Sequence, residues 1–311
     1  MMRRILILLI IACCAIAANA QDYKAYKGKV ANGYDFWLVS PRPDTAGSAK
    51  KPIVVFLHGA SLCGNNLNKV LRYGTVDAIK RGLKLDAYVI APQTQGAWNP
   101  QRVMNVVDYV IDNKLDVDTS RIYVVGMSLG GYGSIDVSNA YPDRIAAALS
   151  FCGGGSAKDY TGLSQMPMWI VHGTGDRAVS VAQSDAVAAA VRAIDGSRLH
   201  YDRIPGMNHS KPARFFYVPE FYEWLFKHSL DDPDRTMAPT FKITDALVSN
   251  AYTKLRGHQT LITAPQTERE APQGITFEDI LQSLDDPSIL YSDPESPDFD
   301  DDNESNPNAA H

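Results

Sequence analysis

Residues 121–133, Arg-Ile-Tyr-Val-Val-Gly-Met-Ser-Leu-Gly-Gly-Tyr-Gly, constrain the fold more than any other stretch of the chain. The apolar run that ends at Gly126 predicts a buried strand, and the residues beyond Gly130 predict a helix that ends near Tyr141. Between them, residues 126–130 fit G-x-S-x-G, a sharp strand-to-helix turn that exposes a serine hydroxyl above a sheet. Glycines suit this turn because residues without a Cβ atom let strand and helix approach closely. The pattern alone is also compatible with a Gly-rich helix start capped by a serine.

Strands and helices alternate along most of the chain in the predicted secondary structure. Apolar runs predict strands at residues 52–57, 87–92, 122–125, 145–151, 168–171 and 199–204, and helical spacing predicts helices at 67–81, 103–113, 130–141, 181–194 and 215–228. Two alternating runs, 23–30 and 34–39, flank Asn32-Gly33 and predict a hairpin. We therefore expect an α/β fold, a mostly parallel doubly wound sheet with an N-terminal antiparallel hairpin, whose ligands bind at the carboxyl ends of the strands.

The first 20 residues have the composition of an export signal peptide. Two arginines precede an almost wholly apolar run, and Ala18-Asn19-Ala20 provides a small-residue cleavage site. The apolar run is too short for a stable membrane span. Residues 10–13, Ile-Ile-Ala-Cys, offer an alternative, since they resemble the box that precedes a lipidated cysteine, here Cys13. We expect a periplasmic or secreted protein, with lipid anchoring at Cys13 as the alternative.

The charge is divided unevenly between residues 21–230, the expected folded domain, and residues 231–311. The latter hold 17 acidic against 5 basic residues and are rich in proline, without sustained helix or strand periodicity. This composition predicts an acidic, largely disordered tail. Within the tail, residues 276–284 have a capping box and helical apolar spacing, which indicates either a transient helix or a docking segment. No basic stripe with interleaved aromatics indicates a nucleic-acid partner, and a partner of the tail stays open.

Serine at neutral pH becomes a good nucleophile only beside a base that is itself oriented by an acid. Ser128 is the central residue of the G-x-S-x-G turn, and His209 lies in the loop directly after the last predicted strand. Asp176 lies in the loop after the preceding strand, while the alternatives Asp195 and Asp202 lie before or within the last strand. The order serine, aspartate, histidine is the one expected for this turn, so we predict Ser128, Asp176 and His209 as a catalytic triad.

An acyl-transfer site also needs two hydrogen-bond donors for the oxyanion. The backbone N–H of Leu129, directly after the serine, and that of Ala60, after the first buried strand, are the predicted donors. His58, at the end of the same strand, is expected to shape the substrate cleft. Trp98 follows another strand end and either stacks on a sugar or aromatic ring of the substrate or packs within its loop.

Two cysteines, Cys63 and Cys152, remain once the signal peptide is removed. Both are expected near the carboxyl ends of strands, where they either pair in an oxidising compartment or remain small buried thiols. No Cys-x-x-Cys or His–Cys spacing indicates a metal site, and we expect neither metal nor another cofactor.

Six segments together resemble secreted α/β-hydrolases. They are Phe-Leu-His-Gly-Ala at 56–60, Val-Ile-Ala-Pro-Gln at 89–93, residues 121–131, Tyr-Pro-Asp-Arg at 141–144, Phe-Cys-Gly-Gly at 151–154 and His-Gly-Thr-Gly-Asp at 172–176. Within that superfamily the chain is similar to the polyhydroxybutyrate-depolymerase-like and feruloyl or acetylxylan esterase group, whose members are often labelled phospholipase/carboxylesterases or putative peptidases. The resemblance covers about residues 52–228, implies the α/β-hydrolase fold, and implies the same triad.

These features predict an exported serine esterase that works through an acyl-enzyme. No insertion is long enough for a large lid, which favours an open cleft and esters of polysaccharide, acyl or feruloyl, or other short-chain esters. Two alternatives to an esterase stay open. One is a serine peptidase of the same fold, which cleaves amides as well, and the other is a non-catalytic binding protein, which usually lacks a triad member.

Overall fold

The computed structural model describes residues 21–41, 49–114 and 116–265, which belong to one compact unit. The predicted signal peptide, lipidation site Cys13 and tail helix at residues 276–284 lie outside the described residues. None of the helices within these ranges is long and apolar enough to cross a bilayer.

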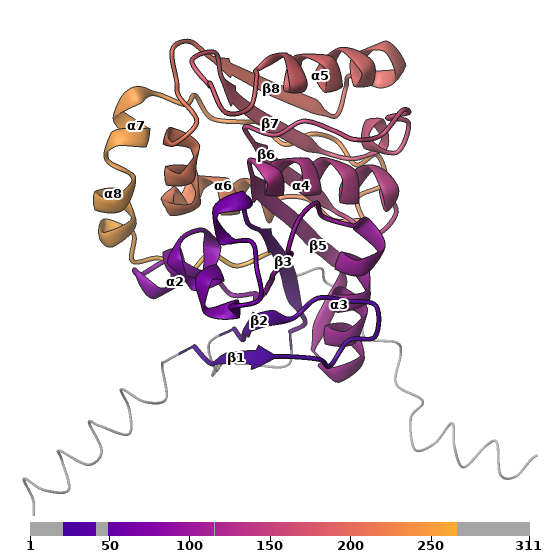
Figure 1. Cartoon of the computed structure of the whole chain (residues 1–311), viewed down its shortest axis with the longest axis vertical. Helices are drawn as coiled ribbons and strands as arrows, with labels where there is room; N and C mark the ends of the chain where they lie inside the picture. The colour runs from indigo at the N-terminus through magenta and orange to yellow at the C-terminus, as the bar shows by residue number, and fades with distance from the viewer. Residues whose placement is uncertain (1–20, 42–48, 115, 266–311) are drawn as a thin grey trace, which may run out of the picture. The chain divides into compact units, whose positions relative to one another are not determined.

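An eight-stranded sheet forms the centre of this unit, in the order β1-β2-β4-β3-β5-β6-β7-β8 (Figure 1). Strands β3 to β8 run parallel, whereas β1 and β2 pair antiparallel and β2 joins β4 antiparallel. This confirms the predicted mostly parallel sheet with its N-terminal hairpin. The strands are β1 (Tyr23–Tyr26), β2 (Phe36–Val39), β3 (Lys51–Leu57), β4 (Tyr88–Pro92), β5 (Val117–Met127), β6 (Ala147–Phe151), β7 (Met168–Gly173) and β8 (Leu199–Ile204).

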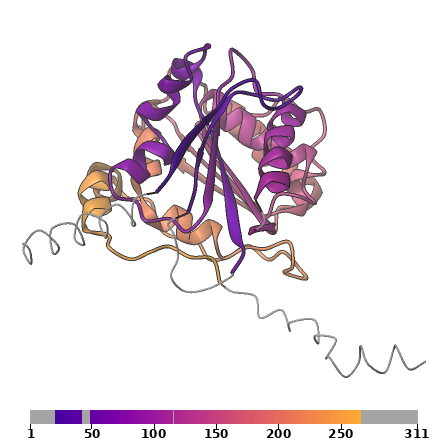
Figure 2. The ribbon, with the colours of Figure 1, turned by 90° about the horizontal axis from the view of Figure 1, so that it is seen from below.

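Helices cover both faces of the sheet (Figure 2). Strand β3 is buried along its whole length, and its residues alternate between the two core layers: Val54 and Phe56 face one layer, Val55 and Leu57 the other. The layer around Val55 contains α3 (Pro100–Asn113), α4 (Leu129–Ala140) and α5 (Ala182–Asp195). The layer around Phe56 contains α2 (Thr75–Lys80), α6 (Pro219–Leu225), α7 (Asp245–Ser249) and α8 (Ala251–Gly257).

Two predicted helices are each divided into shorter ones. The helix expected at residues 67–81 is the 3₁₀ helix η2 (Leu67–Arg72) followed by α2, because Gly74 adopts a φ of 90° between them. The helix expected at 215–228 is the 3₁₀ helix η4 (Lys211–Tyr217) followed by α6, which begins at Pro219. Proline disfavours a helical conformation at the residue before it, so the chain breaks there. Two further 3₁₀ turns are η1 (Ala60–Leu62) and η3 (Leu163–Gln165).

Residues 231–265, which we call the C-terminal strap, differ from the sequence-based expectation. They were expected in the disordered tail, but in the structure they fold against the domain through α7 and α8. Val248, Ala251 and Leu255 are buried in the core layer of α2 and α6. The backbone of Ile262 bonds to Lys84 and Asp86, which extends the contact to the loop before β4. The folded domain therefore reaches at least 35 residues beyond the expected boundary at residue 230.

Buried polar groups anchor the beginning of the strap. The indole of Trp224 donates to the carbonyl of Ala238 at 3.1 Å, and the N–H of Ala238 donates to Nε2 of His228 at 3.0 Å. Burial lowers the pKa of His228 to about 4, so its ring is neutral and able to accept this bond. Arg235 donates from its guanidinium to the carbonyls of Pro142, Ile145 and Ala146. The Arg235 contacts join residues far apart in the sequence, so no local periodicity predicts them.

Candidate active site

The turn between β5 and α4 holds Ser128 in a strained backbone conformation. Its φ of 58° and ψ of −121° are rarely adopted by a residue with a side chain. The flanking glycines are required sterically: a Cβ atom at Gly130 would lie 1.9 Å from the carbonyl oxygen of Leu57, and one at Gly126 would lie 2.1 Å from that of Gly130. The sequence therefore forms the sharp turn that the G-x-S-x-G pattern predicts.

The structure brings the three predicted triad residues into one hydrogen-bonded series. Nε2 of His209 lies 3.0 Å from Oγ of Ser128, and Nδ1 lies 2.6 Å from Oδ2 of Asp176. An ionised carboxylate only accepts hydrogen bonds, so Nδ1 carries the proton and Nε2 presents its lone pair to the serine hydroxyl. This is the tautomer that a general base for the serine requires.

Asp176 is fixed as an ionised acceptor. Its side chain is 1% exposed. Oδ1 accepts from the N–H groups of Ala178 at 2.8 Å and Val179 at 2.9 Å. Burial raises the pKa of this carboxyl, but the bonds from His209 and the two backbone N–H groups together outweigh burial, so the pKa is lowered. His172, at the end of β7, lies 3.3 Å from Oδ2 and 2.8 Å from Ser184, and so helps to hold the aspartate loop.

The alternative acids lie elsewhere. Asp195 pairs with Arg198 at 3.0 Å at the end of α5. Asp202 accepts from the indole of Trp169 at 2.8 Å on β8. Among the three candidate aspartates, Asp176 alone contacts a histidine that also reaches Ser128.

The loop after β3 lies against the serine and presents the predicted oxyanion donors. A Cβ atom at Gly59 would be 3.4 Å from Cβ of Ser128. In the part of the chain that the structure describes, the N–H groups of Ala60 and Leu129 donate to no protein acceptor. The N–H of Gly59 donates to the hydroxyl of Tyr73 at 2.7 Å, which fixes the loop. Sequence reasoning missed Tyr73, since an aromatic residue before a glycine carries no specific signal.

His58 and Trp98 do not line the cleft as expected. His58 is fully buried: its Nδ1 lies 2.8 Å from the carbonyl of Gly59, and its Nε2 accepts from the N–H of Thr94 at 3.2 Å. Trp98 is 6% exposed, and its indole donates to the carbonyl of His58 at 3.2 Å. Burial lowers the pKa of His58 to about 4, so its ring is neutral. The two side chains support the oxyanion loop. This corrects the predicted role of His58 and, of the two alternatives for Trp98, favours packing within the loop.

Cys63 and Cys152 are free thiols in the structure, so the disulfide alternative does not occur. Cys152 is buried beside the triad, and its Sγ, a carboxylate oxygen of Asp176 and a ring nitrogen of His209 lie within 4.8 Å of one another. Metal ligation requires a thiolate, whereas burial raises the pKa of this thiol well above its ordinary value. Because Asp176 and His209 already bond each other, the geometry favours a hydrogen-bonded acid–base pair over metal binding.

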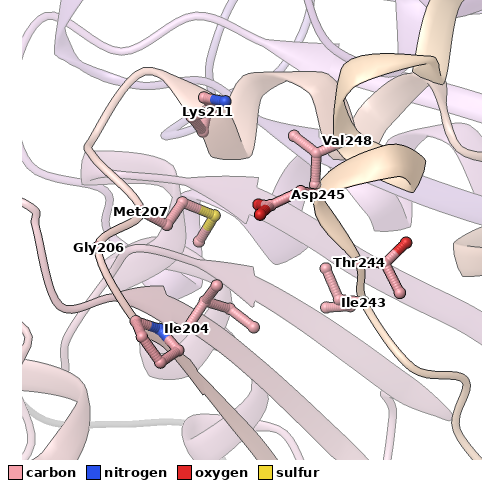
Figure 3. Close-up of a pocket in the computed structure, with 9 residues that line it drawn as sticks. Ile204, Gly206, Met207, Lys211, Ile243, Thr244, Asp245 and Val248 are labelled. Carbon is pink, nitrogen blue, oxygen red and sulfur yellow. The ribbon is translucent and has the colours of Figure 1, made fainter.

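A hollow of about 460 Å³ lies behind the His209 loop (Figure 3). It is bounded by residues 204–207 on one side and by the strap around α7 on the other. The side chains of Met207 and Asp245 point toward each other across it. The hydroxyl of Thr174 accepts from the N–H of Gly206 at 2.9 Å, which ties this loop to the aspartate loop. The strap thus borders the segment that positions the candidate base.

Comparison with known proteins identifies the fold. No protein-family model and no curated protein matches the chain. Among solved structures, a thermostable esterase is similar with a TM-score of 0.55 and 26% identity, covering 67% of this chain and 63% of the esterase. This protein has the α/β-hydrolase fold. An acylaminoacyl peptidase from Pyrococcus horikoshii shows the same fold, with a TM-score of 0.50 and 14% identity over 74% of this chain and 44% of the peptidase. The chain thus spans less than two thirds of either protein.

Proposed function

We propose that this protein is a serine hydrolase that cleaves carboxylic esters through an acyl-enzyme. The single observation that supports this most strongly is the series Ser128–His209–Asp176, with bonds of 3.0 and 2.6 Å, at the strained turn after β5. The similarity to a thermostable esterase supports ester cleavage in particular. The organisation of the chain completes the proposal: a signal peptide at residues 1–20 that directs export, and an acidic tail beyond the C-terminal strap.

The reaction follows from the geometry. Oγ of Ser128 attacks the ester carbonyl while Nε2 of His209 takes its proton, and Asp176 stabilises the imidazolium that forms. The N–H groups of Leu129 and Ala60 stabilise the negative charge on the former carbonyl oxygen, each contributing about 3 kcal/mol. His209 then returns the proton to the leaving alcohol. Water, deprotonated by His209, attacks the acyl-enzyme, releases the acid and restores the serine.

An ester panel tests the proposal. Protein lacking residues 1–20 is assayed with aryl esters from acetate to octanoate and with methyl ferulate, beside Ser128→Ala. We expect at least a 10³-fold loss of turnover in Ser128→Ala. The matched control is Ser156→Ala, which removes an exposed hydroxyl from the loop after β6 and should leave turnover unchanged. Near-normal turnover by a folded Ser128→Ala would refute the proposal, and equal cleavage of matched amides would assign a peptidase instead.

A further inference from the structure

A second hollow, of about 520 Å³, lies at the same edge of the sheet as the triad. We call it the polar hollow, because polar side chains dominate its wall. Four segments enclose it: the connection between β1 and β2, the loop after β4, the first turn of α3 and the loop between η1 and η2. Its polar lining includes Asp35, Asn65, Gln93, Thr94, Gln95 and Arg102.

The polar hollow lies within reach of a substrate bound at Ser128. Along the sheet, β3 separates β5 from β4, and neighbouring strands are about 4.8 Å apart, so the end of β4 is about 10 Å from the end of β5. The loops are also joined directly. The N–H of Thr94 donates to Nε2 of His58, and the carbonyl of Thr94 accepts from the N–H of Gly64 at 3.0 Å. A small alcohol attached to the ester does not span this distance, but a larger alcohol does.

The wall of the hollow is held in place before any ligand binds. The buried amide of Gln93 donates to the carbonyls of Leu62 and Asn66, at 2.8 and 3.0 Å, and so fixes the loop that carries Asn65. Arg102 donates from Nε and Nη2 to the carbonyl of Gly33, at 3.2 and 2.7 Å. Side chains that are ordered in advance lose less entropy on binding, which favours a specific site.

The exposed groups match hydroxyls better than they match an ion. Oδ1 of Asp35 accepts from the N–H of Gly28 at 2.8 Å, and within the described ranges Oδ2 has no protein partner. The side-chain amides of Asn65 and Gln95 are exposed and each offers a donor and an acceptor. One carboxylate and one guanidinium, that of Arg102, balance in charge. A neutral molecule with many hydroxyl groups, each of which donates and accepts, complements this wall.

We propose that the polar hollow binds a neutral sugar residue in the alcohol part of the substrate. The inference rests on the proposed ester hydrolysis and specifies where selectivity for saccharide esters resides. It also replaces the predicted stacking on Trp98, which is buried. Asp35, Asn65 and Gln95 bind the sugar hydroxyls, while Arg102, stacked 4.1 Å from the ring of Tyr34, supports the wall and donates at its edge.

The test compares two substrates with the same acyl group. The enzyme is assayed with 4-nitrophenyl acetate and with an acetylated neutral xylo-oligosaccharide, beside the variant Asn65→Ala/Gln95→Ala. We expect KM for the saccharide ester to rise about 10-fold, while kcat/KM for the aryl ester stays within about 2-fold. Thr244→Ala, in the hollow behind the His209 loop, is the matched control and should change neither value. An equal change for both esters, or no change for the saccharide ester, would overturn the inference.

A binding measurement separates this inference from the proposed function. Calorimetry with the Ser128→Ala protein and the deacetylated xylo-oligosaccharide should detect binding that Asn65→Ala/Gln95→Ala weakens about 10-fold. Inorganic phosphate should not compete. Absence of saccharide binding, or competition by phosphate, would overturn the sugar subsite even if aryl esters are hydrolysed. Saccharide binding without turnover of any ester would instead contradict the proposed function and leave the subsite intact.

Discussion

His209 and His58 lie at the two halves of the sheet edge, in opposite environments. In the half formed by β5 to β8, His209 is about a quarter exposed and lies between a carboxylate and a hydroxyl. In the half formed by β2 to β4, His58 is fully buried, and among the described residues its ring bonds only to backbone groups of Gly59 and Thr94. Both rings follow or end a strand, and both lie in loops that border the serine.

The difference shows that the hydrogen-bond partners and the burial of a histidine, rather than its residue type or its position on the fold, decide whether it can transfer protons or only supports the structure. A ring between an ionised acid and a hydroxyl is able to take up and return a proton. A buried ring that bonds only backbone stays neutral and fixes the distance between two loops. We therefore propose that the β5–β8 half carries out the reaction, and that the β2–β4 half holds the oxyanion loop and binds the alcohol part of the substrate.

Asp176→Asn should produce the largest effect. An amide in place of the carboxylate favours the wrong tautomer of His209 and does not stabilise the imidazolium, so kcat should fall on the order of 10⁴-fold. Steady-state kinetics on an aryl ester measures this. Asp202→Asn is the matched control and should retain most activity, because Asp202 bonds Trp169 and not His209. If Asp202→Asn lost activity and Asp176→Asn kept it, Asp176 would not be the acid of the triad.

Gly130→Ala and Gly96→Ala compare backbone packing in the two halves. The added methyl at Gly130 meets the carbonyl of Leu57 in a central strand, so we expect unfolding free energy to fall by about 3 kcal/mol or more. At Gly96, on the wall of the polar hollow, an added Cβ meets nothing within 4 Å. We expect a change below about 1 kcal/mol there. Urea denaturation of both variants checks the contrast, and similar losses would contradict it.

The buried ring of His58 predicts that stability depends on pH. Burial lowers the pKa of His58 to about 4, from 6.5 in the unfolded chain. Below pH 6.5 the unfolded chain binds a proton that the folded chain does not, so stability is lost as the pH falls toward 4, by up to about 3 kcal/mol. Urea midpoints at pH 7, 5.5 and 4.5 measure the slope. His58→Gln should have a shallower slope, and an unchanged slope would show that His58 titrates equally in both states.

Trp98→Phe should have the smallest effect. The phenyl ring keeps most of the packing against His58 and Tyr34 but lacks the donor to the carbonyl of His58. We expect a loss of about 1 kcal/mol in stability and a change in aryl-ester kcat/KM of less than about 3-fold. If Trp98→Phe weakened saccharide binding without loss of stability, Trp98 would stack on the substrate after all. That result would contradict the different roles given to the two halves of the sheet edge.

The candidate triad was predictable because each member is encoded locally. Ser128 lies in a turn with a steric signature, and Asp176 and His209 lie in loops whose strands are recognisable from apolar runs. Parallel strands bring their carboxyl ends to one edge, which assembles the three without further information. The role of His58 was not predictable, since it depends on a backbone N–H from Thr94. For Trp98 the sequence left substrate stacking and loop packing open, and its burial beside His58 decides for packing.

The C-terminal strap was missed for a related reason. Its buried residues include Val248, Ala251 and Leu255 on α7 and α8, helices of five and seven residues that are too short to give a clear helical period in the sequence. Both helices pack against η4, and the core layer that they join also contains α2, far away in the sequence. The composition of residues 231–311 taken together, acidic and rich in proline, pointed to disorder. Tertiary packing decided the outcome.

Covalent labelling tests the central claim most directly. A fluorophosphonate reacts with a serine that a neighbouring base activates, and mass spectrometry locates the modified residue. We predict one label per chain, on Ser128, in the unmodified protein and in His58→Gln, and almost none in folded His209→Gln. Labelling at another residue, or labelling of His209→Gln at the normal rate, would contradict the account.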